Sequence, residues 1–328
     1  AVAALATMGV KSLPVKMPGQ VLAAISPDGQ LCATVGEPNV LQIRRVSDEG
    51  IIASIPAPIG GGSNVHAIHR VQLSTHFFAR AYVLRHGGRR LEVWRIPQAD
   101  IWIENNDLPD QSSFNISADE QWIAFPSNDK TIKLVNLESR QEVHRIKLDH
   151  DAGYLKFDPS RRWLARFHGA DASATVHDLH TGESHSIFTG ANAQWALDWS
   201  ADSSLVAAGD GHVVRLWDMV SGRIVGELNG HSSQVVVVKF SPDASMLTSY
   251  GWDGLSILWD VKSGQPLVKL DFAVIAWPAA SNHLIGSARS GLHECEIEQS
   301  QEYFSIVGSG DQADPERLVT SPHLAFDP

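Results

Sequence analysis

Cysteine is nearly absent from this chain. Only Cys32 and Cys295 occur in 328 residues, and no Cys-x-x-Cys pair is present. Two thiols cannot supply the disulfide framework that stabilises small secreted domains, and they give neither the paired ligands of a structural zinc site nor a redox motif. Both cysteines fall within runs that we expect to be strands. We therefore predict that both are buried thiols.

Long apolar runs and targeting signals are also missing. No stretch approaches the roughly 18 consecutive apolar residues of a membrane span. The N-terminal sequence, AVAALATMGVKSL, has no initiator methionine and lacks the basic and apolar regions of a signal peptide. We expect a soluble, globular piece excised from a longer protein, without a membrane segment and with a cytoplasmic location.

Basic residues are in deficit. The chain has 26 Lys and Arg against 37 Asp and Glu, which gives a net charge of −11 with histidine neutral. A nucleic-acid partner requires a clustered basic face that contacts phosphates, so none is expected. The acidic balance itself is accounted for by solubility.

Motifs that carry chemistry are absent as well. The chain contains no H-E-x-x-H, no G-x-S-x-G and no phosphate-binding glycine loop. Two histidine pairs are three residues apart, His66 with His69 and His177 with His180. That spacing suits a helix, whereas on a strand it sends the two side chains to opposite faces. The acidic and imidazole cluster at 149–151 falls in an expected turn. The sequence thus predicts no catalytic residue, no metal site and no cofactor.

What the chain does contain is clearest between Gly230 and Asp260, GHSSQVVVVKFSPDASMLTSYGWDGLSILWD. The stretch holds a Gly-His turn, a β-rich run at 234–240, a Ser-Pro-Asp turn, a second run at 246–250, an Asp-Gly turn and a third run that ends in Trp-Asp. Three strands joined by tight turns predict an antiparallel meander.

Related stretches recur at intervals of about 40 residues, the period of a repeat architecture. Positions equivalent to the tryptophan of this stretch are Arg44, Trp94, Val135, His177, Trp217, Trp259 and Cys295. An independent marker, the turn after the first strand of each unit, keeps the same period at Ser26, Ser74, Ser117, Asp158, Ser200, Ser241 and near Pro278. Two markers with one period predict seven units.

The repeats resemble those of the WD-repeat family. In that family a histidine, a strand hydroxyl, a turn aspartate and a strand tryptophan form a hydrogen-bonded series across each blade. The matching positions here are His231, Ser249, Asp253 and Trp259. Such a network is physically useful because each buried polar group left unpaired costs about 1–3 kcal/mol.

The resemblance implies an all-β fold, a seven-bladed β-propeller of four-stranded antiparallel blades. We expect an N-terminal closing strand within 1–20, with SLPVKM (12–17) pairing in blade 7 in competition with 301–305, and a linker or start of a further strand or domain at 306–328. The propeller spans 21–305, with blades at about 21–55, 67–103, 112–147, 152–188, 194–228, 234–270 and 273–305.

The match to the family is complete in one unit alone. Blades 3 and 4 keep Asp129 and Asp171 six residues before the marker, but we expect Phe125 and Phe167 at the hydroxyl position. Blade 5 keeps its tryptophan but has its acid at Asp210. The sequence therefore predicts a diverged repeat that is held mainly by apolar packing.

Two functions are compatible with these patterns. The resemblance implies a non-catalytic scaffold that presents one end of the ring to a protein or peptide; in bacteria such domains are often fused to signalling modules, so a longer multidomain chain is expected. The alternative is a propeller hydrolase or metal-dependent enzyme with its site in the central channel. No set of converging acids, bases or ligands is visible in the sequence to favour it.

The resemblance also places the partner-binding surface. In WD-repeat proteins the contacts come from residues that flank the first apolar residue of the inner strand and from the residue before the turn aspartate. Carried over, these are Asp110, Ser112, Asn128, Asp151, Trp195, Gln234, Val236 and Trp252. Trp195 and Trp252 lie among polar residues, which is typical of an interaction hot spot. The open alternative is that Trp195 packs against Trp199 and that Trp252 merely covers a turn.

Overall fold

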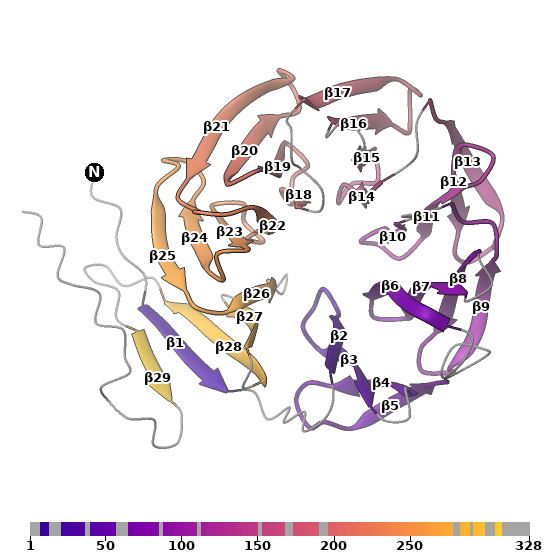
Figure 1. The fold of residues 1–328 in the computed structure, drawn as a ribbon, viewed down its shortest axis with the longest axis horizontal. Coiled ribbons are helices and arrows are strands. Elements are labelled where there is room, and N and C mark those ends of the chain that lie inside the picture. Colours follow the sequence, from indigo (N-terminus) through magenta and orange to yellow (C-terminus); the bar gives the residue numbers. More distant parts are fainter. Residues whose placement is uncertain are drawn as a thin grey trace, which may run out of the picture.

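The computed structural model describes residues 7–12, 21–36, 40–56, 65–84, 88–109, 113–149, 153–167, 173–189, 196–277, 283–288, 291–298 and 306–309. These residues form strands and turns, and no helix occurs among them. The strands associate into seven sheets, which consist mainly of antiparallel pairs and are arranged as a ring around one axis (Figure 1). The predicted seven-bladed, all-β propeller is confirmed. We number the blades 1 to 7 along the chain and call the strands of a blade a to d from the innermost outwards.

Six blades consist of four consecutive strands in the order a-b-c-d. Blade 1 contains β2 (Val21–Ile25), β3 (Leu31–Gly36), β4 (Val40–Arg45) and β5 (Ile51–Ile55). Blade 2 contains β6 (Val65–Leu73), β7 (Phe77–Leu84), β8 (Arg89–Arg95) and β9 (Asp100–Asn105). Blade 3 contains β10 (Asn115–Ile116), β11 (Trp122–Ser127), β12 (Thr131–Asn136) and β13 (Glu142–Lys147).

The second half of the ring repeats this order. Blade 4 contains β14 (Leu155–Phe157), β15 (Trp163–Phe167), β16 (Ser173–Asp178) and β17 (Ser184–Thr189). Blade 5 contains β18 (Leu197–Trp199), β19 (Leu205–Asp210), β20 (Val213–Asp218) and β21 (Arg223–Asn229). Blade 6 contains β22 (Val235–Phe240), β23 (Met246–Gly251), β24 (Ser256–Asp260) and β25 (Pro266–Leu270).

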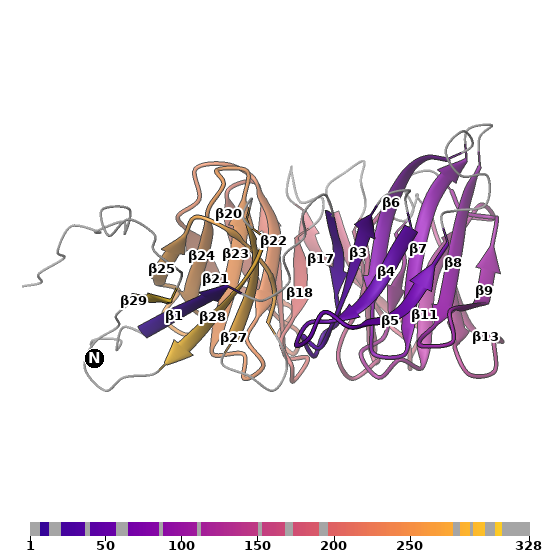
Figure 2. The ribbon, with the colours of Figure 1, turned by 90° about the horizontal axis from the view of Figure 1, so that it is seen from below.

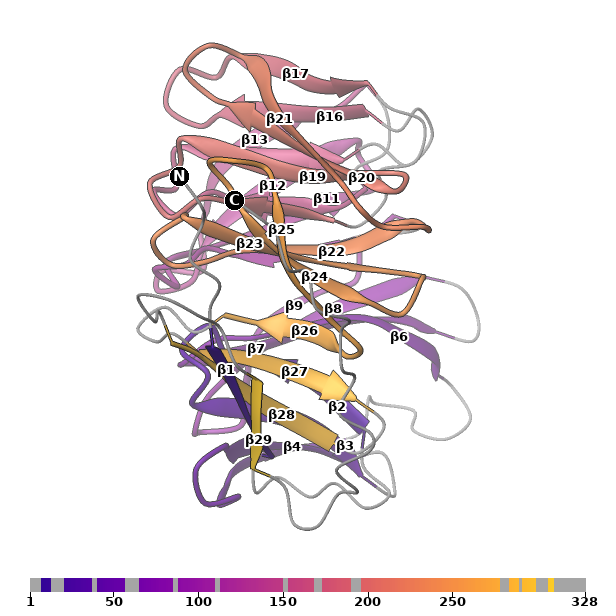
Figure 3. The same cartoon turned by 90° about the vertical axis from the view of Figure 1, so that its left-hand side faces the viewer.

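Blade 7 is built from both ends of the chain. Its first three strands are β26 (Ala273–Ala276), β27 (His283–Ala288) and β28 (Gly291–Glu298). The N-terminal β1 (Thr7–Ser12) pairs antiparallel with β28 as strand d, and β29 (Ile306–Ser309) adds parallel to β1 outside it (Figure 3). A strand from the N-terminal region therefore covers the edge that β28 would otherwise expose.

The closing strand differs in position from the sequence expectation. We expected 12–17, whereas β1 is Thr7–Ser12, and residues 13–17 lie outside the described residues, as does the competing segment 301–305. Residues 306–309 fall in the expected linker but form β29. In both cases backbone pairing within blade 7 determines which residues form the strand. The local sequence pattern does not encode this pairing.

A repeated turn joins strand a to strand b. The marker residue is buried, and its side-chain oxygen accepts a hydrogen bond from the N–H five residues later in blades 1, 3, 4, 5 and 6. Three residues after the marker the backbone adopts positive φ, at Gly29, Glu120, Arg161, Ser203 and Ala244. Only the first of these is glycine, so the other four turns accept the steric cost of a Cβ in the left-handed region.

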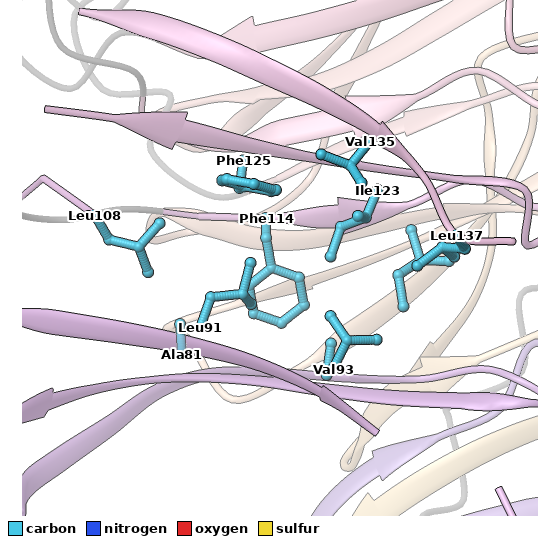
Figure 4. Packing of buried hydrophobic residues seen from close by; sticks show 11 residues of the cluster. Ala81, Leu91, Val93, Leu108, Phe114, Ile123, Phe125, Val135 and Leu137 are labelled. Atoms are coloured by element: carbon cyan, nitrogen blue, oxygen red, sulfur yellow. The ribbon is translucent and has the colours of Figure 1, made fainter. Parts of the chain in front are cut away.

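The core lies between blades. Each of six clusters of buried side chains joins the facing sides of two neighbouring sheets. Between blades 2 and 3, for example, Leu91 and Val93 of β8 pack against Phe114, Ile123 and Phe125 (Figure 4). Full burial of side chains of this size contributes about 1.5–3 kcal/mol each. The ring is thus held by contacts that no single repeat makes alone.

The antiparallel order places the connections at two ends of the ring, because the strands run roughly along its axis (Figure 2). The b–c turns, and the connections from strand d of one blade to strand a of the next, share one end, which we call the upper end. The a–b and c–d turns share the opposite, lower end. The described residues that we expect to bind a partner belong to a connection at the upper end or to the adjacent first strand: Asn128, Gln234, Val236 and Trp252.

Candidate functional site

Blade 6 brings its four polar residues into one buried network. His231 precedes β22, and its Nε2 lies 2.7 Å from Ser249 Oγ on β23. Trp259 Nε1 on β24 donates to the same hydroxyl oxygen at 2.8 Å. His231 Nδ1 lies 2.9 Å from Asp253 Oδ2 in the b–c turn. A carboxylate only accepts, so Nδ1 carries the proton and Nε2 accepts from the serine hydroxyl.

Asp253 connects this network to the backbone of the upper end. Its carboxylate also accepts from the N–H groups of Ser232, at 2.9 Å, and Leu255, at 3.2 Å. Burial disfavours the charged form, yet the Ser232 N–H, the His231 ring and the Leu255 N–H together hold the pKa of Asp253 below its ordinary value. The carboxylate therefore stays ionised and ties the turn to the segment that enters the blade.

Glycine at 251 is a part of this network that the sequence analysis missed. A Cβ at this position would lie 2.8 Å from both His231 Nδ1 and Asp253 Oδ1. No side chain fits there unless the hydrogen bond between those two residues is displaced. The Tyr-Gly-Trp-Asp sequence carries the signal, since a glycine inside a strand marks a close approach.

Blade 2 replaces the histidine network with a buried ion pair that sequence reasoning also missed. Arg80 on β7 occupies the register position of Ser249 and pairs with Glu92 on β8, with Nε to Oε2 at 2.8 Å. Tyr82 and Trp94 donate to the same carboxylate, at 2.7 Å and 3.1 Å. Arg80 Nη1 donates to the carbonyl of Pro56, just after strand d of blade 1, at 2.9 Å. The signal was Glu92, a charged residue within an apolar strand.

Blades 3 and 4 fill the same region with other polar pairs. In blade 3 the carboxylate comes from Asp107, before β10, and accepts from Ser127 Oγ at 2.5 Å and Asn128 Nδ2 at 2.9 Å. In blade 4 Asp149 contacts the buried Arg166 of β15 at 3.2 Å. The expectation that Phe167 stands at the hydroxyl position of blade 4 is wrong. Strand register puts Arg166 there, because Leu164 is the residue that pairs with His177.

Other positions of blades 3, 4 and 5 also depart from the pattern of blade 6. Phe125 of blade 3 does occupy the register position of the hydroxyl, opposite Lys133. In blade 5 that position is Ala208, and Asp210 instead contacts Arg215 at 3.2 Å within its own hairpin. His177, at the tryptophan position of blade 4, is buried with Nδ1 2.7 Å from Ser184 Oγ. Blades 2 to 5 thus combine apolar packing with a different polar link in each blade.

The structure places four of the eight residues expected to contact a partner. Trp252 has 68% of its surface exposed. Asn128 is exposed, and Gln234 and Val236 are half-buried at the start of β22. Asp110, Ser112, Asp151 and Trp195 lie outside the described residues. Trp195 packing against Trp199 is likewise outside what the structure describes.

Trp252 is fixed by its backbone while its ring points to solvent. Its N–H donates to the carbonyl of Gln234 at 2.8 Å, which joins the b–c turn to the start of strand a. The next residue, Asp253, is bound to His231. Gly254 adopts φ +81°, a conformation that closes the turn without a Cβ penalty. The indole therefore projects from a turn that is fixed by hydrogen bonds, and most of the Trp252 surface is exposed.

The described residues offer little for other classes of site. They contain no group of three or more His, Cys, Asp or Glu that could hold a metal ion. Within the same ranges there is no helix of the length and hydropathy required to cross a membrane. Cys32 and Cys295 are buried free thiols, and burial raises the pKa of Cys32 to about 11, so its reactive thiolate is scarce at neutral pH.

The family model for the WD domain, G-beta repeat, matches residues 181–218 and 222–260. The second match contains the whole network from His231 to Trp259, and the first covers β17, the outermost strand of blade 4, and the first three strands of blade 5. Residues 181–260 of this chain therefore carry WD repeats, and the chain is similar to WD-repeat proteins. These two matches do not extend to blades 1, 2, 3 and 7. In blades 2 and 3 other polar groups occupy the region of the four-residue series.

Known WD-repeat relatives align with parts of this chain. It is 39% identical over 62 residues to the small ribosomal subunit protein RACK1y of Oryza sativa subsp. japonica, covering 19% of this chain and 18% of the relative. It is 28% identical over 165 residues to a guanine nucleotide-binding protein subunit beta of Oryza sativa subsp. indica, covering 45% and 43%. Identity to transcription initiation factor TFIID subunit 5 of Caenorhabditis elegans is 25% over 151 residues, covering 45% and 23%. The WD-repeat chain therefore spans less than half of each relative.

Proposed function

We propose that this WD-repeat propeller is a non-catalytic interaction module that binds a protein or peptide at its upper end. The observation that carries the proposal is Trp252, 68% exposed on a turn that is fixed by the buried network of blade 6. Among the large hydrophobic side chains exposed in the described part of the chain, it is the one aromatic. Aromatic anchors on rigid supports are enriched at interaction hot spots.

The surroundings of Trp252 suit a mixed interface. Gln234 immediately precedes β22 and Val236 lies on it, while the exposed Asn128 occupies the corresponding turn of blade 3, across the ring (Figure 1). We include Asp110, Ser112, Asp151 and Trp195, which lie outside the described residues, in the proposed surface because the resemblance to the WD-repeat family implies them. An apolar centre with a polar rim is the usual anatomy of a non-obligate interface. The compared proteins bear the names of subunits or ribosomal components, which supports a role within an assembly.

Nothing in the described residues favours the alternative of a hydrolase or metal enzyme. A cytoplasmic location and a longer multidomain, signalling-type parent protein remain predictions from the sequence.

The test uses peptides selected from a random library displayed on phage against the unmodified protein. Trp252→Ala removes the proposed anchor from a turn that is held by backbone and Asp253 contacts, so the variant is expected to keep its urea melting midpoint and to lose at least about tenfold in affinity, since hot-spot aromatics contribute about 2 kcal/mol or more.

The matched control is Val220→Ala, which truncates a side chain that is 91% exposed in a c–d turn at the lower end. We expect this variant to bind the selected peptides like the unmodified protein. Unchanged affinity in a folded Trp252→Ala variant, or an equal loss in both variants, would remove the upper end from consideration.

A further inference from the structure

Three charged residues from adjacent blades meet at the inner rim of the ring. Lys156 is the middle residue of β14, Asp198 the middle residue of β18, and Lys239 lies on β22; these are strands a of blades 4, 5 and 6 (Figure 1). Lys156 Nζ lies 2.9 Å from Asp198 Oδ1. The amino groups of Lys156 and Lys239 lie next to each other.

These positions are equivalent along the repeat, each two residues before the a–b turn marker. At three of them an acceptor oxygen takes a hydrogen bond from the N–H of the next blade's inner strand. Gln72 accepts from Ile116 at 2.9 Å, Asn115 from Phe157 at 2.8 Å, and Asp198 Oδ2 from Phe240 at 3.0 Å. Lysine has donors only and cannot make this link. Lys156 instead reaches the next blade as a donor, through its ion pair with Asp198. Lys239 is a second ammonium group beside the same carboxylate.

The cluster carries an excess of positive charge. Asp198 uses one carboxylate oxygen for Lys156 and the other for the Phe240 N–H, so one negative charge faces two ammonium groups. The charge of Lys156 lowers the pKa of Lys239, although Asp198 opposes this. Tyr154 is a further titratable neighbour of the two lysines. Side-chain exposures of 19% for Lys156 and 13% for Asp198 leave the cluster accessible to small solutes.

We propose that Lys156 and Lys239 form a binding site for a small oxyanion, a phosphate or a carboxylate group, at the inner rim of blades 4 to 6. An oxyanion that bridges the two ammonium groups removes their mutual repulsion and forms charge-assisted hydrogen bonds in a partly desolvated setting. Asp198 positions Lys156 through its ion pair and binds blade 6 through its second oxygen. This site is distinct from the upper-end surface around Trp252, so each proposal can fail without the other.

Acetylation of the unmodified protein tests the site without any substitution. Acetic anhydride is applied in inorganic phosphate, in acetate and in potassium chloride of equal ionic strength, and the modification of each lysine is followed by mass spectrometry. At a ligand concentration about ten times the dissociation constant, acetylation of Lys239 slows about tenfold, because only the free fraction reacts. Lys269, exposed on β25, is the internal control and keeps its rate.

Protection in phosphate or in acetate identifies which kind of oxyanion the site takes. Equal slowing of Lys239 and Lys269, or no slowing beyond that in chloride, overturns the proposal. Calorimetric titration with the protecting anion then compares variants. Lys239→Met loses saturable binding, Lys239→Arg keeps it because the charge remains, and Lys269→Met binds like the unmodified protein. Saturable binding by a folded Lys239→Met variant would also overturn the assignment.

Discussion

At the scale of single residues, the blade 6 network depends on Asp253. The carboxylate accepts hydrogen bonds from His231, the Ser232 N–H and the Leu255 N–H. It therefore connects the b–c turn to the segment before β22. Through the ring of His231 it is also linked to the hydroxyl of Ser249 on β23. The side chain is almost entirely buried. Its removal leaves several donors without an acceptor, whereas removal of a surface carboxylate leaves its partner to water.

We predict that Asp253→Ala lowers the free energy of unfolding by about 1–3 kcal/mol. Asp210→Ala is the control, because Asp210 contacts one partly exposed arginine within its own hairpin and should cost about 0–1 kcal/mol. Urea melts of the two variants measure the difference. Equal losses would show that the blade 6 network is not special.

The same carboxylate predicts a pH dependence. The pKa of Asp253 is lowered in the folded protein, so the ionised group stabilises the fold above its unfolded pKa of about 4, and this stabilisation is lost as the pH falls through the folded pKa. The difference in unfolding free energy between the unmodified protein and Asp253→Asn should be constant near neutral pH and shrink below pH about 4. A difference that grows on acidification would contradict this assignment.

At the scale of elements, the a–b turn shows how one local structure accepts several sequences. In blades 1, 3, 4, 5 and 6 its marker side chain is buried and accepts an N–H, while the residue three positions later has positive φ whether or not it is glycine. In blade 6 this residue is Ala244, with φ 57°, and in blade 1 it is Gly29, with φ 71°. The steric cost of a Cβ in this conformation is about 1 kcal/mol or more.

Ala244→Gly should therefore stabilise the protein by up to about 1 kcal/mol, less the entropy that glycine adds to the unfolded chain. The reverse substitution in the equivalent turn, Gly29→Ala, should destabilise by a similar amount. Thermal melts followed by circular dichroism report both changes. The prediction requires that Ala244→Gly and Gly29→Ala change the stability in opposite directions. Destabilisation by both variants would show that the positive φ does not control the stability of this turn.

Blade 2 makes a second prediction at this scale. Arg80 and Glu92 are fully buried, so Glu92→Gln leaves an uncompensated charge in the interior and should cost about 3–5 kcal/mol. Asp48→Asn breaks the exposed pair between Asp48 and Arg45 and should change stability little. Guanidinium melts distinguish the two variants. A small effect of Glu92→Gln would mean that Tyr82 and Trp94 bind the neutral amide as well as they bind the carboxylate.

At the scale of the whole molecule, the ring closes through β1. Its six residues pair with β28, so the chain brings its first and last blades together by backbone hydrogen bonds. The parallel β29 adds four residues beyond β1 and touches no other strand in the sheet order. The two strands therefore differ in importance, since β1 covers the edge of a three-stranded sheet and β29 extends one already complete.

Removal of residues 1–12 should lower the melting temperature and promote association, because β28 then presents an open edge. Removal of residues 306–328 should leave both properties nearly unchanged. Thermal melts and size-exclusion chromatography of the two truncated chains check this. A greater loss on removing 306–328 than on removing 1–12 would show that the ring is closed from the other terminus.

The sequence by itself determined the number of blades and the network of blade 6. Turn markers and strand tryptophans recur with a fixed period, and the four polar residues of blade 6 keep spacings set by local strand and turn geometry. The hydrogen bonds of this network join residues 10 to 22 positions apart within a single blade, so their spacing recurs with the repeat and can be read along the chain. The same holds for the buried cysteines and the seven inner strands.

Only the tertiary structure decided what lies across strands and blades. Strand register placed Arg166 rather than Phe167 at the hydroxyl position and turned Arg80 and Glu92 into an ion pair. Packing of neighbouring blades brought Lys156 into contact with Asp198, which is 42 residues away in the sequence. Pairing with β28 placed β1 at residues 7–12. Contacts between blades join segments that are far apart in the sequence, so they leave no local sequence pattern. Backbone pairing depends little on side-chain identity, so it leaves no local pattern either.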